Sequence, residues 1–385
     1  FYVGYLDYRE LESALERYDA DYLVVAKRTL ADRAVDSIGR ATFAEFRADL
    51  SPDGRWLAFL SDRGDDDAQT QGWAMPAGGG EARVLTNLPG GVDDFQWSPD
   101  SQRLAVIASD PERPAGTPKP KNPLPIVTER WQFKKDVDGY LDARRSHLYV
   151  HDVARSESMQ ITFGDHDEAL PAWSPDGRQI AYVTRRGGEP DRHSNFDIYL
   201  VEPRAGATER RLTTFDGADN DPDLGSPISW SPDGRQIAFV QGGEDKWIYY
   251  APHQLAIVDV ATGRTRVPAP IDRWFTQPRW SPDGRSVLAL IEQSRVINLS
   301  RIEVASGKVT PLTTGPRHDA GFAVSKQGRI VVLGGDDVTP FELAALEQGT
   351  LRPLGSHNEW LAQKKLVRFD DITFKSADGT SIDGF

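Results

Sequence analysis

The sequence predicts an all-β fold, a β-propeller built from four-stranded blades. The prediction depends on a turn that recurs along the chain and on the alternating apolar strand that follows each copy. Ser-Pro-Asp-Gly or a close variant of it begins at six positions: Ser51, Ser98, Ser174, Ser231, Ser281 and Ser325. Repeats of about 40–50 residues with short strands are typical of propeller blades.

Each residue of the recurring turn suits a tight connection between two antiparallel strands. Proline presets φ at about −65°, Asp tolerates the second turn position, and Gly accepts the positive φ that closes the hairpin. We therefore interpret the aspartates of the repeat as turn formers and not as functional groups: Asp53, Asp100, Asp176, Asp233 and Asp283.

The segments around the turn supply four strands in each repeat. A tryptophan precedes the turn in four copies: Trp97, Trp173, Trp230 and Trp280. An alternating apolar strand such as 178–182 follows the turn, then a third strand such as 255–259, and then a short fourth strand that often ends in Leu-Thr. Six blades carry the turn, and a strand at 22–27 supplies a seventh from residues 21–43. We favour seven blades, with six as the alternative.

The segment before the blades has the pattern of a short amphipathic helix. Over residues 1–19, apolar side chains recur at helical spacing and charged residues occupy the other face. Such a short helix is unstable alone, so we expect it to cap the propeller or to reach a second domain.

Composition limits the kinds of partner. The net charge of −13 repels phosphate backbones and anionic lipids, so we expect no nucleic-acid and no membrane partner. Cysteine is absent, which excludes disulfides, zinc–thiolate sites and a cysteine nucleophile. This absence is compatible with a reducing compartment, and we expect a cytoplasmic protein.

One interval of the repeat is longer than the others. Ser98 and Ser174 are 76 residues apart, whereas the other intervals run from 44 to 57. The extra residues form an insert over 110–147, whose first part is rich in Pro and Lys and whose second part mixes aromatic and charged residues. Long loops on a rigid scaffold often carry function, although packing over a blade edge explains the insert equally well. The predicted substrate-contact residues are Arg130, Trp131, Lys134, Tyr140, Arg144 and Arg145.

The sequence contains no recognisable catalytic or metal-binding motif. No Gly-x-Ser-x-Gly nucleophile motif, P-loop or dinucleotide fingerprint occurs. The acidic run 219–223 lacks the Gly and Glu of a calcium loop, since Leu224 and Trp230 occupy those positions. We expect no catalytic residue, no metal and no cofactor in this chain.

The last residues depart from the repeat. Residues 359–365 read as a linker, and 367–385 read as a strand, an Asp-Gly turn and a second strand. Together with the repeat over 20–356 and the insert residues Trp131, Asp138-Gly139-Tyr140 and Arg144-Arg145, this tail resembles the prolyl-oligopeptidase (S9) family of serine peptidases. The acylaminoacyl-peptidase branch is the most similar, and the resemblance covers nearly the whole chain.

The resemblance implies a two-domain hydrolase in which residues 357–385 are a linker and the first strands of an α/β-hydrolase domain. The catalytic Ser, Asp and His would lie beyond Phe385, and the propeller would restrict entry to short or N-acylated peptides. The implied partners are a peptide substrate and this C-terminal hydrolase domain, while homo-oligomerisation stays open. The helix over 5–18 would pack against the hydrolase.

Two other interpretations remain open. The same turn occurs in propellers similar to the periplasmic TolB scaffold, so the chain could be a stand-alone protein-binding propeller. A propeller lyase or glycosidase would need channel-facing carboxylates or histidines, which the sequence cannot place. The insert and the tail favour the peptidase interpretation, because a stand-alone propeller does not require them.

Overall fold

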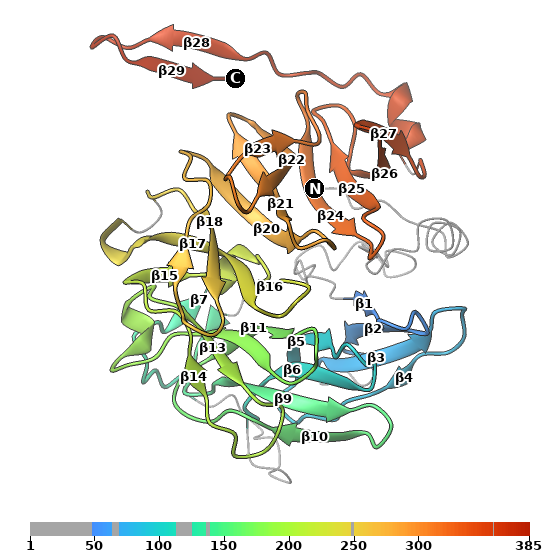
Figure 1. Cartoon of the computed structure of the whole chain (residues 1–385), viewed down its shortest axis with the longest axis vertical. Coiled ribbons are helices and arrows are strands. Elements are labelled where there is room, and N and C mark those ends of the chain that lie inside the picture. Colours follow the sequence, from blue (N-terminus) through green and yellow to red (C-terminus); the bar gives the residue numbers. More distant parts are fainter. Residues whose placement is uncertain (1–47, 64–68, 113–124, 136–138, 248–249, 357) are drawn as a thin grey trace.

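The computed structural model describes the chain except for residues 1–47, 64–68, 113–124, 136–138, 248–249 and 357. Six blades are present in the described part, arranged in a ring with the first strand of each blade nearest its middle (Figure 1). Five of them have four strands, and blade four has a fifth because its first strand is interrupted. The predicted all-β propeller is thus confirmed. The predicted helix over 1–19 and the seventh blade over 21–43 lie outside the described residues. No described helix is long and apolar enough to cross a membrane.

The first three blades follow the chain in order, except that the insert separates the second and third strands of blade two. Blade one contains β1 (Ala48–Leu50), β2 (Trp56–Ser61), β3 (Gln71–Pro76) and β4 (Arg83–Val84). Blade two contains β5 (Val92–Trp97), β6 (Arg103–Ser109), β9 (Ser146–Asp152) and β10 (Glu157–Gln160). Blade three contains β11 (Glu168–Trp173), β12 (Ile180–Thr184), β13 (Asp197–Val201) and β14 (Arg210–Arg211).

The remaining three blades repeat this order with small changes. In blade four, β15 (Gly217–Asp219) and β16 (Ser229–Trp230) both pair with β17 (Gln236–Glu244), which is followed by β18 (Gln254–Asp259) and β19 (Thr265–Arg266). Blade five contains β20 (Trp274–Trp280), β21 (Ser286–Gln293), β22 (Val296–Glu303) and β23 (Val309–Pro311). Blade six contains β24 (His318–Val324), β25 (Ile330–Gly335), β26 (Glu342–Glu347) and β27 (Thr350–Pro353). One parallel pair, Ile297 with His318, joins blades five and six.

The recurring turn has the geometry that its residues predict. Gly54 has φ of 71°, and Ser101, which replaces glycine in the second copy, has φ of 60°. The Ser51 hydroxyl donates to the Asp53 carboxylate at 2.6 Å, and the same carboxylate accepts the backbone N–H of Arg55 at 3.1 Å. The interpretation of the repeat aspartates as turn formers is therefore confirmed.

Apolar side chains pack between neighbouring blades and form the core there. One cluster joins Ile198 and Leu200 of blade three to Ile237 and Phe239 of blade four. Burying an aliphatic or aromatic side chain of this size contributes about 1.5–3 kcal/mol. Since each blade has apolar residues on its faces, it needs a neighbour to cover them, and clusters of this kind join each consecutive pair from blade one to blade six.

The threonines that end the repeats, in Leu-Thr pairs or in the Ile161-Thr162 pair of blade two, connect one blade to the next. The Thr162 hydroxyl accepts the backbone N–H of Leu148 at 2.9 Å and donates to the Glu168 carboxylate of the following blade at 2.7 Å. Thr313 makes the same contacts with the backbone of Leu299 and with Asp319. The pairs follow the last strands directly, so the predicted fourth strands end two residues earlier than expected.

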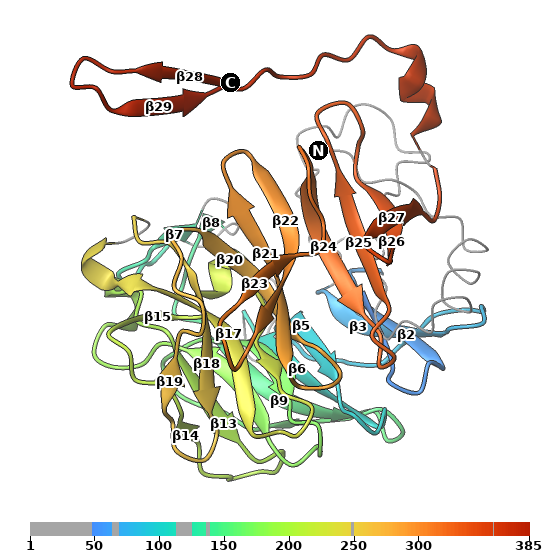
Figure 2. The same cartoon turned by 45° about the horizontal axis from the view of Figure 1, so that its top comes forward.

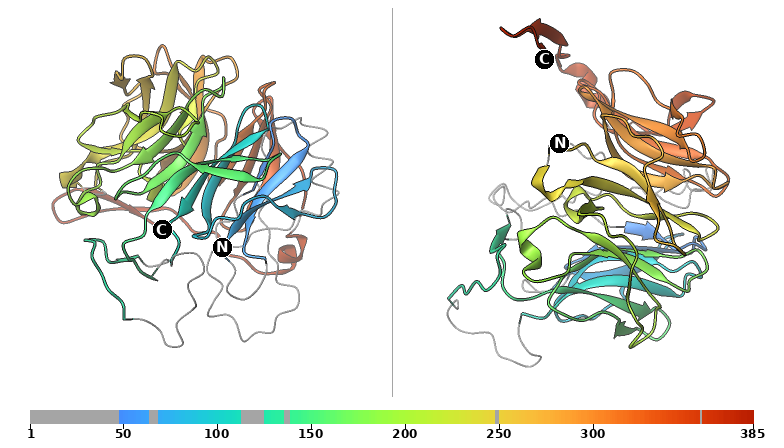
Figure 3. Two further views of the ribbon diagram at one scale, coloured as in Figure 1. Left: turned by 90° about the horizontal axis from the view of Figure 1, so that it is seen from below. Right: turned by 60° about the vertical axis from the view of Figure 1, so that its left-hand side comes forward.

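Antiparallel pairing gives the ring two distinct faces. Because successive strands reverse direction, the Ser-Pro-Asp-Gly turns all lie on one face, which we call the turn face. The connections between second and third strands, and those between blades, lie on the opposite face, which we call the connection face. The insert and the C-terminal tail therefore leave the ring on the same side, as Figure 3 (left) shows for the teal and red segments.

The tail extends from the connection face and forms the predicted hairpin. After η5 (Glu359–Gln363) the chain reaches β28 (Ile372–Lys375) and β29 (Ser381–Gly384), which stand apart from the blades in Figure 2. Arg295, in the turn between β21 and β22, pairs with Asp371 at 2.7 Å and with Asp337 at 3.1 Å. The first of these ion pairs places the start of the hairpin beside Arg295, and the second joins blades five and six.

Candidate functional site

The insert begins and ends side by side at the connection face. It leaves β6 after Ser109 and returns to β9 at Ser146, and these two residues are paired in the sheet. The backbone N–H of Asp110 donates to the Arg145 carbonyl at 2.7 Å, and the Arg145 N–H donates to the Asp110 carboxylate at 3.1 Å. The insert is therefore a loop whose two ends are hydrogen-bonded to each other at its base. The pairing between β6 and β9 continues unbroken up to that base.

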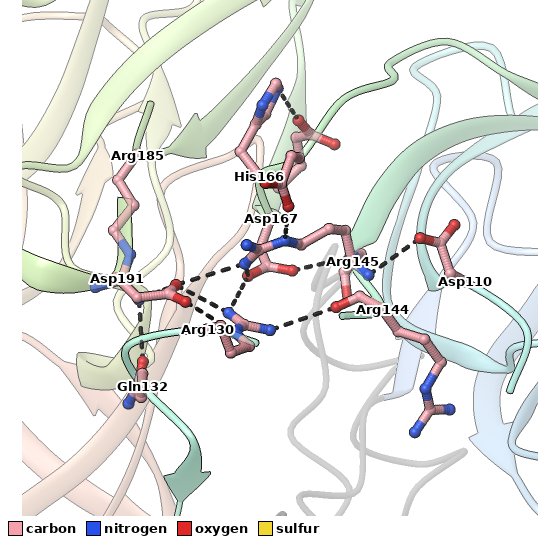
Figure 4. A network of polar contacts seen from close by, with 12 residues as sticks. Asp110, Arg130, Gln132, Arg144, Arg145, His166, Asp167, Arg185 and Asp191 are labelled. Carbon is pink, nitrogen blue, oxygen red and sulfur yellow. Dashed lines mark hydrogen bonds and ion pairs between the residues drawn. The ribbon is translucent and has the colours of Figure 1, made fainter. Parts of the chain in front are cut away.

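A network of three arginines and three aspartates fastens this base to blade three (Figure 4). Its members are Arg130, Arg145, Arg185, Asp165, Asp167 and Asp191, and we call it the arginine–aspartate network. Arg130 donates to Asp191 at 2.8 Å and to Asp167 at 2.9 Å. Arg145 donates to Asp165 at 2.8 Å and to Asp167 at 3.1 Å.

Asp191 is the most buried carboxylate of this network, at the short helix η2 (Pro190–Arg192). Its side chain is 3% exposed, and it also pairs with Arg185 at 3.3 Å. Burial disfavours its charged form, but the hydrogen bonds of Arg130 and the charges of Arg145 and Arg185 outweigh this effect and hold the pKa of Asp191 below its usual range. The Asp191 carboxylate is accordingly ionised at neutral pH.

The other candidate residues of the insert are exposed. Trp131 is 63% exposed, with the guanidinium of Arg192 4.5 Å from the centre of its ring. Tyr140 is 56% exposed and has the Lys134 ammonium 6.0 Å from its ring centre, across the two-stranded hairpin β7 (Lys134–Lys135) and β8 (Gly139–Tyr140). Arg144 forms an exposed ion pair with Asp142 at 2.8 Å.

The structure thus divides the six predicted residues into two sets. Arg130 and Arg145 lie together in the arginine–aspartate network, where carboxylates occupy their donors and hold the insert in place. Trp131, Lys134, Tyr140 and Arg144 are exposed at the surface. The sequence could not separate these sets, because Asp165, Asp167 and Asp191 are remote along the chain.

A second polar cluster lies beside the network and was not predicted. Glu168, fully buried, accepts from Thr162 and lies 2.9 Å from His147 and 3.2 Å from His166. Burial opposes ionisation of both partners, but their mutual attraction lowers the pKa of Glu168 and raises that of His147. The sequence holds a clue: a carboxylate six residues after the repeat threonine recurs at Glu168, Asp219 and Asp319.

The acidic run 219–223 has structural contacts. Asp221 caps η3 (Pro222–Leu224) by accepting the N–H of Asp223 at 2.9 Å, and Asp219 accepts from Gln241 at 2.8 Å. Within the described ranges, no group of three or more His, Cys, Asp or Glu side chains is arranged to hold a metal ion.

Comparisons with known proteins agree with this architecture. The family model of the TolB beta propeller domain (PD40) matches residues 140–337. An uncharacterized peptidase of Bacillus subtilis, YuxL, is 33% identical over 155 residues, which are 39% of this chain and 23% of that protein. Dipeptidyl-peptidase 5 of Porphyromonas gingivalis is 31% identical over 156 residues, which are 40% of this chain and 22% of that protein.

A solved structure shows the same fold over most of the chain. The acylaminoacyl peptidase of Pyrococcus horikoshii superposes with a TM-score of 0.67 at 20% identity, over 88% of this chain and 49% of that one. The matched segments span about a quarter of the length of the two curated relatives. The chain is therefore a propeller related to the propellers of these peptidases.

Proposed function

Because the chain belongs to the family of TolB β-propeller (PD40) domains, we propose that it is the substrate-gating domain of a serine peptidase that hydrolyses short or N-acylated peptides. The gate works by shape: the ring and its insert limit which substrates reach the catalytic groups. Its domain partner is a C-terminal α/β-hydrolase domain with a Ser, Asp and His triad. Its substrate is a peptide, and the protein is cytoplasmic.

The observation that carries the proposal is the common face of the insert and the tail. Both leave the ring at the connection face, so a domain that continues the tail sheet would lie over the insert. The hairpin exposes Ile372, Phe374 and Phe385 to 52%, 53% and 71%. A two-stranded hairpin with exposed apolar residues is marginal alone, which supports its being part of a larger sheet.

The position of Trp131 supports a contact between the insert and the substrate. Its ring is exposed on the connection face, while its backbone neighbour Arg130 is held by Asp167 and Asp191. A rigid base with an exposed aromatic ring is suited to contact a peptide, since the ring loses little conformational entropy on binding.

The coding sequence downstream of Phe385 tests the assignment to a peptidase. We expect Gly-x-Ser-x-Gly, then Asp, then His in that order, within about 250 residues as in one α/β domain. A stop codon shortly after Phe385 would contradict the proposal and favour the binding scaffold described below.

Kinetics of the full-length enzyme test the substrate contact. We expect Trp131→Ala to raise KM for short peptides about three- to tenfold with kcat unchanged, because it removes an aromatic contact outside the catalytic groups. Met159→Ala, at an exposed position on the outermost strand β10, is the control and leaves both parameters unchanged. An unchanged KM for Trp131→Ala would indicate that Trp131 has a structural role and does not contact the substrate.

The second candidate is a protein-binding propeller similar to TolB. The family name favours it, and the matched region 140–337 excludes the tail. The exposed hairpin β28–β29 argues for the peptidase, because a scaffold of this kind does not require a two-stranded element outside the ring.

A further inference from the structure

Tryptophans fill the space between adjacent blades near the turn face. The indole N–H of Trp97 donates to the Asp49 carbonyl at 3.2 Å, and that of Trp280 donates to the Ser229 carbonyl at 3.1 Å. Trp173 and Trp230 make the same contact with Gln96 and Ala172. In each case the ring closes the junction with the preceding blade.

The junction between blades five and six lacks this ring. The equivalent position in blade six is Val324, directly before the altered turn 325–328. On the facing blade, Ser286 stands where the second blade has Arg103, whose guanidinium stacks on Trp173 at 4.8 Å. Both sides of this junction therefore carry small side chains where another junction is filled by a tryptophan and an arginine.

A cavity of about 1140 Å³ occupies this junction. Its apolar floor consists of Leu288, Val324 and Ile330, and the two turns 281–284 and 326–328 form its mouth. It opens on the turn face, on the opposite side of the ring from the insert. Ligand pockets usually measure about 300–1,000 Å³, so the space accommodates an aromatic side chain together with the backbone on either side of it.

The mouth of the cavity is cationic, although the chain carries a net charge of −13. Arg266, Arg285, Arg301 and Lys326 line it, with Asp283 and Glu303 as the acidic residues. Asp283 already accepts from Ser281 at 2.6 Å, and Glu303 accepts from Ser306 at 2.8 Å. Among the described residues, the guanidinium groups of Arg285 and Arg301 form no hydrogen bond or close ion pair, although the Asp283 carboxylate attracts both. Both side chains are exposed, so they can also pair with the carboxylates of a ligand.

We propose that this cavity binds a short acidic peptide segment that carries an aromatic side chain. The aromatic ring occupies the apolar floor, in the space that a tryptophan fills at the other junctions. Flanking carboxylates pair with Arg285 and Arg301 at the mouth. This site is separate from the proposed gate, because it lies on the face opposite the insert and the tail.

Three peptides tested by isothermal titration calorimetry separate the contributions of ring and charge. We expect the 385-residue chain to bind acetyl-Asp-Trp-Asp-amide, and to bind acetyl-Asn-Trp-Asn-amide and acetyl-Asp-Ala-Asp-amide at least about tenfold more weakly, because each lacks one of the two contacts. Comparable affinity for all three peptides, or no heat with the first, would overturn the proposal.

Variants of the cavity locate the site. We expect Val324→Trp to abolish binding, because the new indole fills the cavity as its counterparts do elsewhere. Val84→Trp, at a half-exposed position on β4, is the matched control and leaves binding unchanged. Undiminished binding by a folded Val324→Trp chain would place the peptide elsewhere and overturn the proposal.

A charge variant keeps the test decisive if Val324→Trp fails to fold. Arg285 and Arg301 are exposed, so replacing both with Gln leaves the core intact. We expect Arg285→Gln/Arg301→Gln to weaken binding of the acidic peptide about tenfold, with about two- to fivefold from the loss of each exposed ion pair. We also expect the affinity of this variant to depend less on salt concentration than that of the parent. An affinity that equals that of the parent at low salt would overturn the proposal.

Discussion

Gly54 closes the first Ser-Pro-Asp-Gly turn with φ of 71°, a left-handed backbone conformation that disfavours residues with a Cβ atom. A Cβ atom added there would meet no atom within 4 Å, so the conformation and not crowding selects glycine. Ser101 takes φ of 60° at the equivalent position, which shows that one copy of the turn tolerates this strain.

Gly54→Ala should lower the free energy of unfolding by about 1–2 kcal/mol, because alanine is strained at positive φ. Gly78→Ala is the matched control: it also faces open space, but its φ is not in the left-handed region. We expect that control to be neutral or slightly stabilising. Urea denaturation of both variants measures the difference, and equal effects would contradict the argument from backbone conformation.

Asp219 illustrates how burial changes a single carboxyl group. It is fully buried in blade four, and burial raises its pKa to about 6. Between the ordinary Asp value of 3.8 and about 6, the folded chain retains a proton that the unfolded chain releases. The contribution of Asp219 to stability is therefore present below this window and is lost as the pH rises through it.

Asp219→Asn should remove the loss of stability that occurs as the pH rises, because an amide does not ionise and its oxygen still accepts the hydrogen bond from Gln241. We expect the variant to be more stable than the parent at pH 7, by at most about 3 kcal/mol, and to lose this advantage at pH 4. Urea denaturation from pH 4 to pH 7 measures it. A variant whose difference from the parent does not change with pH would contradict the assignment.

Asp233 provides a control of opposite sign. The hydrogen bond from Ser231 lowers its pKa, with a further contribution from the backbone N–H of Arg235. Its contribution to stability is present at neutral pH and is lost as the pH falls through its lowered pKa. Asp233→Asn should therefore lower the free energy of unfolding more at pH 7 than at low pH.

At the scale of elements, the base of the insert depends on a carboxylate of blade three. Asp191 of η2 lies among Arg130, Arg145 and Arg185, and it couples the insert to the connection between β12 and β13. Exposed ion pairs contribute little, whereas removing one partner of a buried pair leaves an uncompensated charge. The network therefore determines where Trp131 lies.

Asp191→Asn should cost about 3 kcal/mol and release the insert, because three guanidinium groups then face one another with fewer carboxylates. We expect a lower melting temperature and faster tryptic cleavage within 110–147. Asp142→Asn breaks only the exposed pair with Arg144 and is the control, with an expected cost below about 1 kcal/mol. Equal cleavage rates for the two variants would contradict an anchoring role of the network.

At the scale of the whole molecule, the ring separates two surfaces with different chemistry. The connection face carries the insert, with its exposed aromatic side chains, and the hairpin that leads away from the ring. The turn face carries the repeated turns and the cavity between blades five and six. The proposed gate and the proposed peptide site therefore lie on opposite faces of the ring.

The 385-residue chain should not react with a fluorophosphonate probe. It contains no Gly-x-Ser-x-Gly sequence, and the proposal places the nucleophile in another domain. Gel fluorescence after incubation measures labelling, with an active serine hydrolase in the same reaction as a positive control and heat-denatured chain as the background. Labelling of the native chain above this background would reveal a reactive serine in this chain and would contradict the proposal that the nucleophile lies in another domain.

The sequence by itself determined the elements and the repeat. Turn, strand and cap preferences act over a few residues, so the positions of Pro, Gly and alternating apolar residues sufficed to predict four-stranded blades and the tail hairpin. It also located the insert, because an interval of 76 residues exceeds what one blade needs.

Only the tertiary structure decided what the insert residues do. Arg130 meets Asp191, 61 residues away, because the ring places blade three beside the base of the insert. Such pairing depends on how the blades close and not on local preferences, so the sequence could not distinguish the anchors Arg130 and Arg145 from the exposed Trp131 and Tyr140. Val324 can be recognised in the sequence as a departure from the repeat. The cavity, however, exists because the facing residue on blade five, Ser286, is also small.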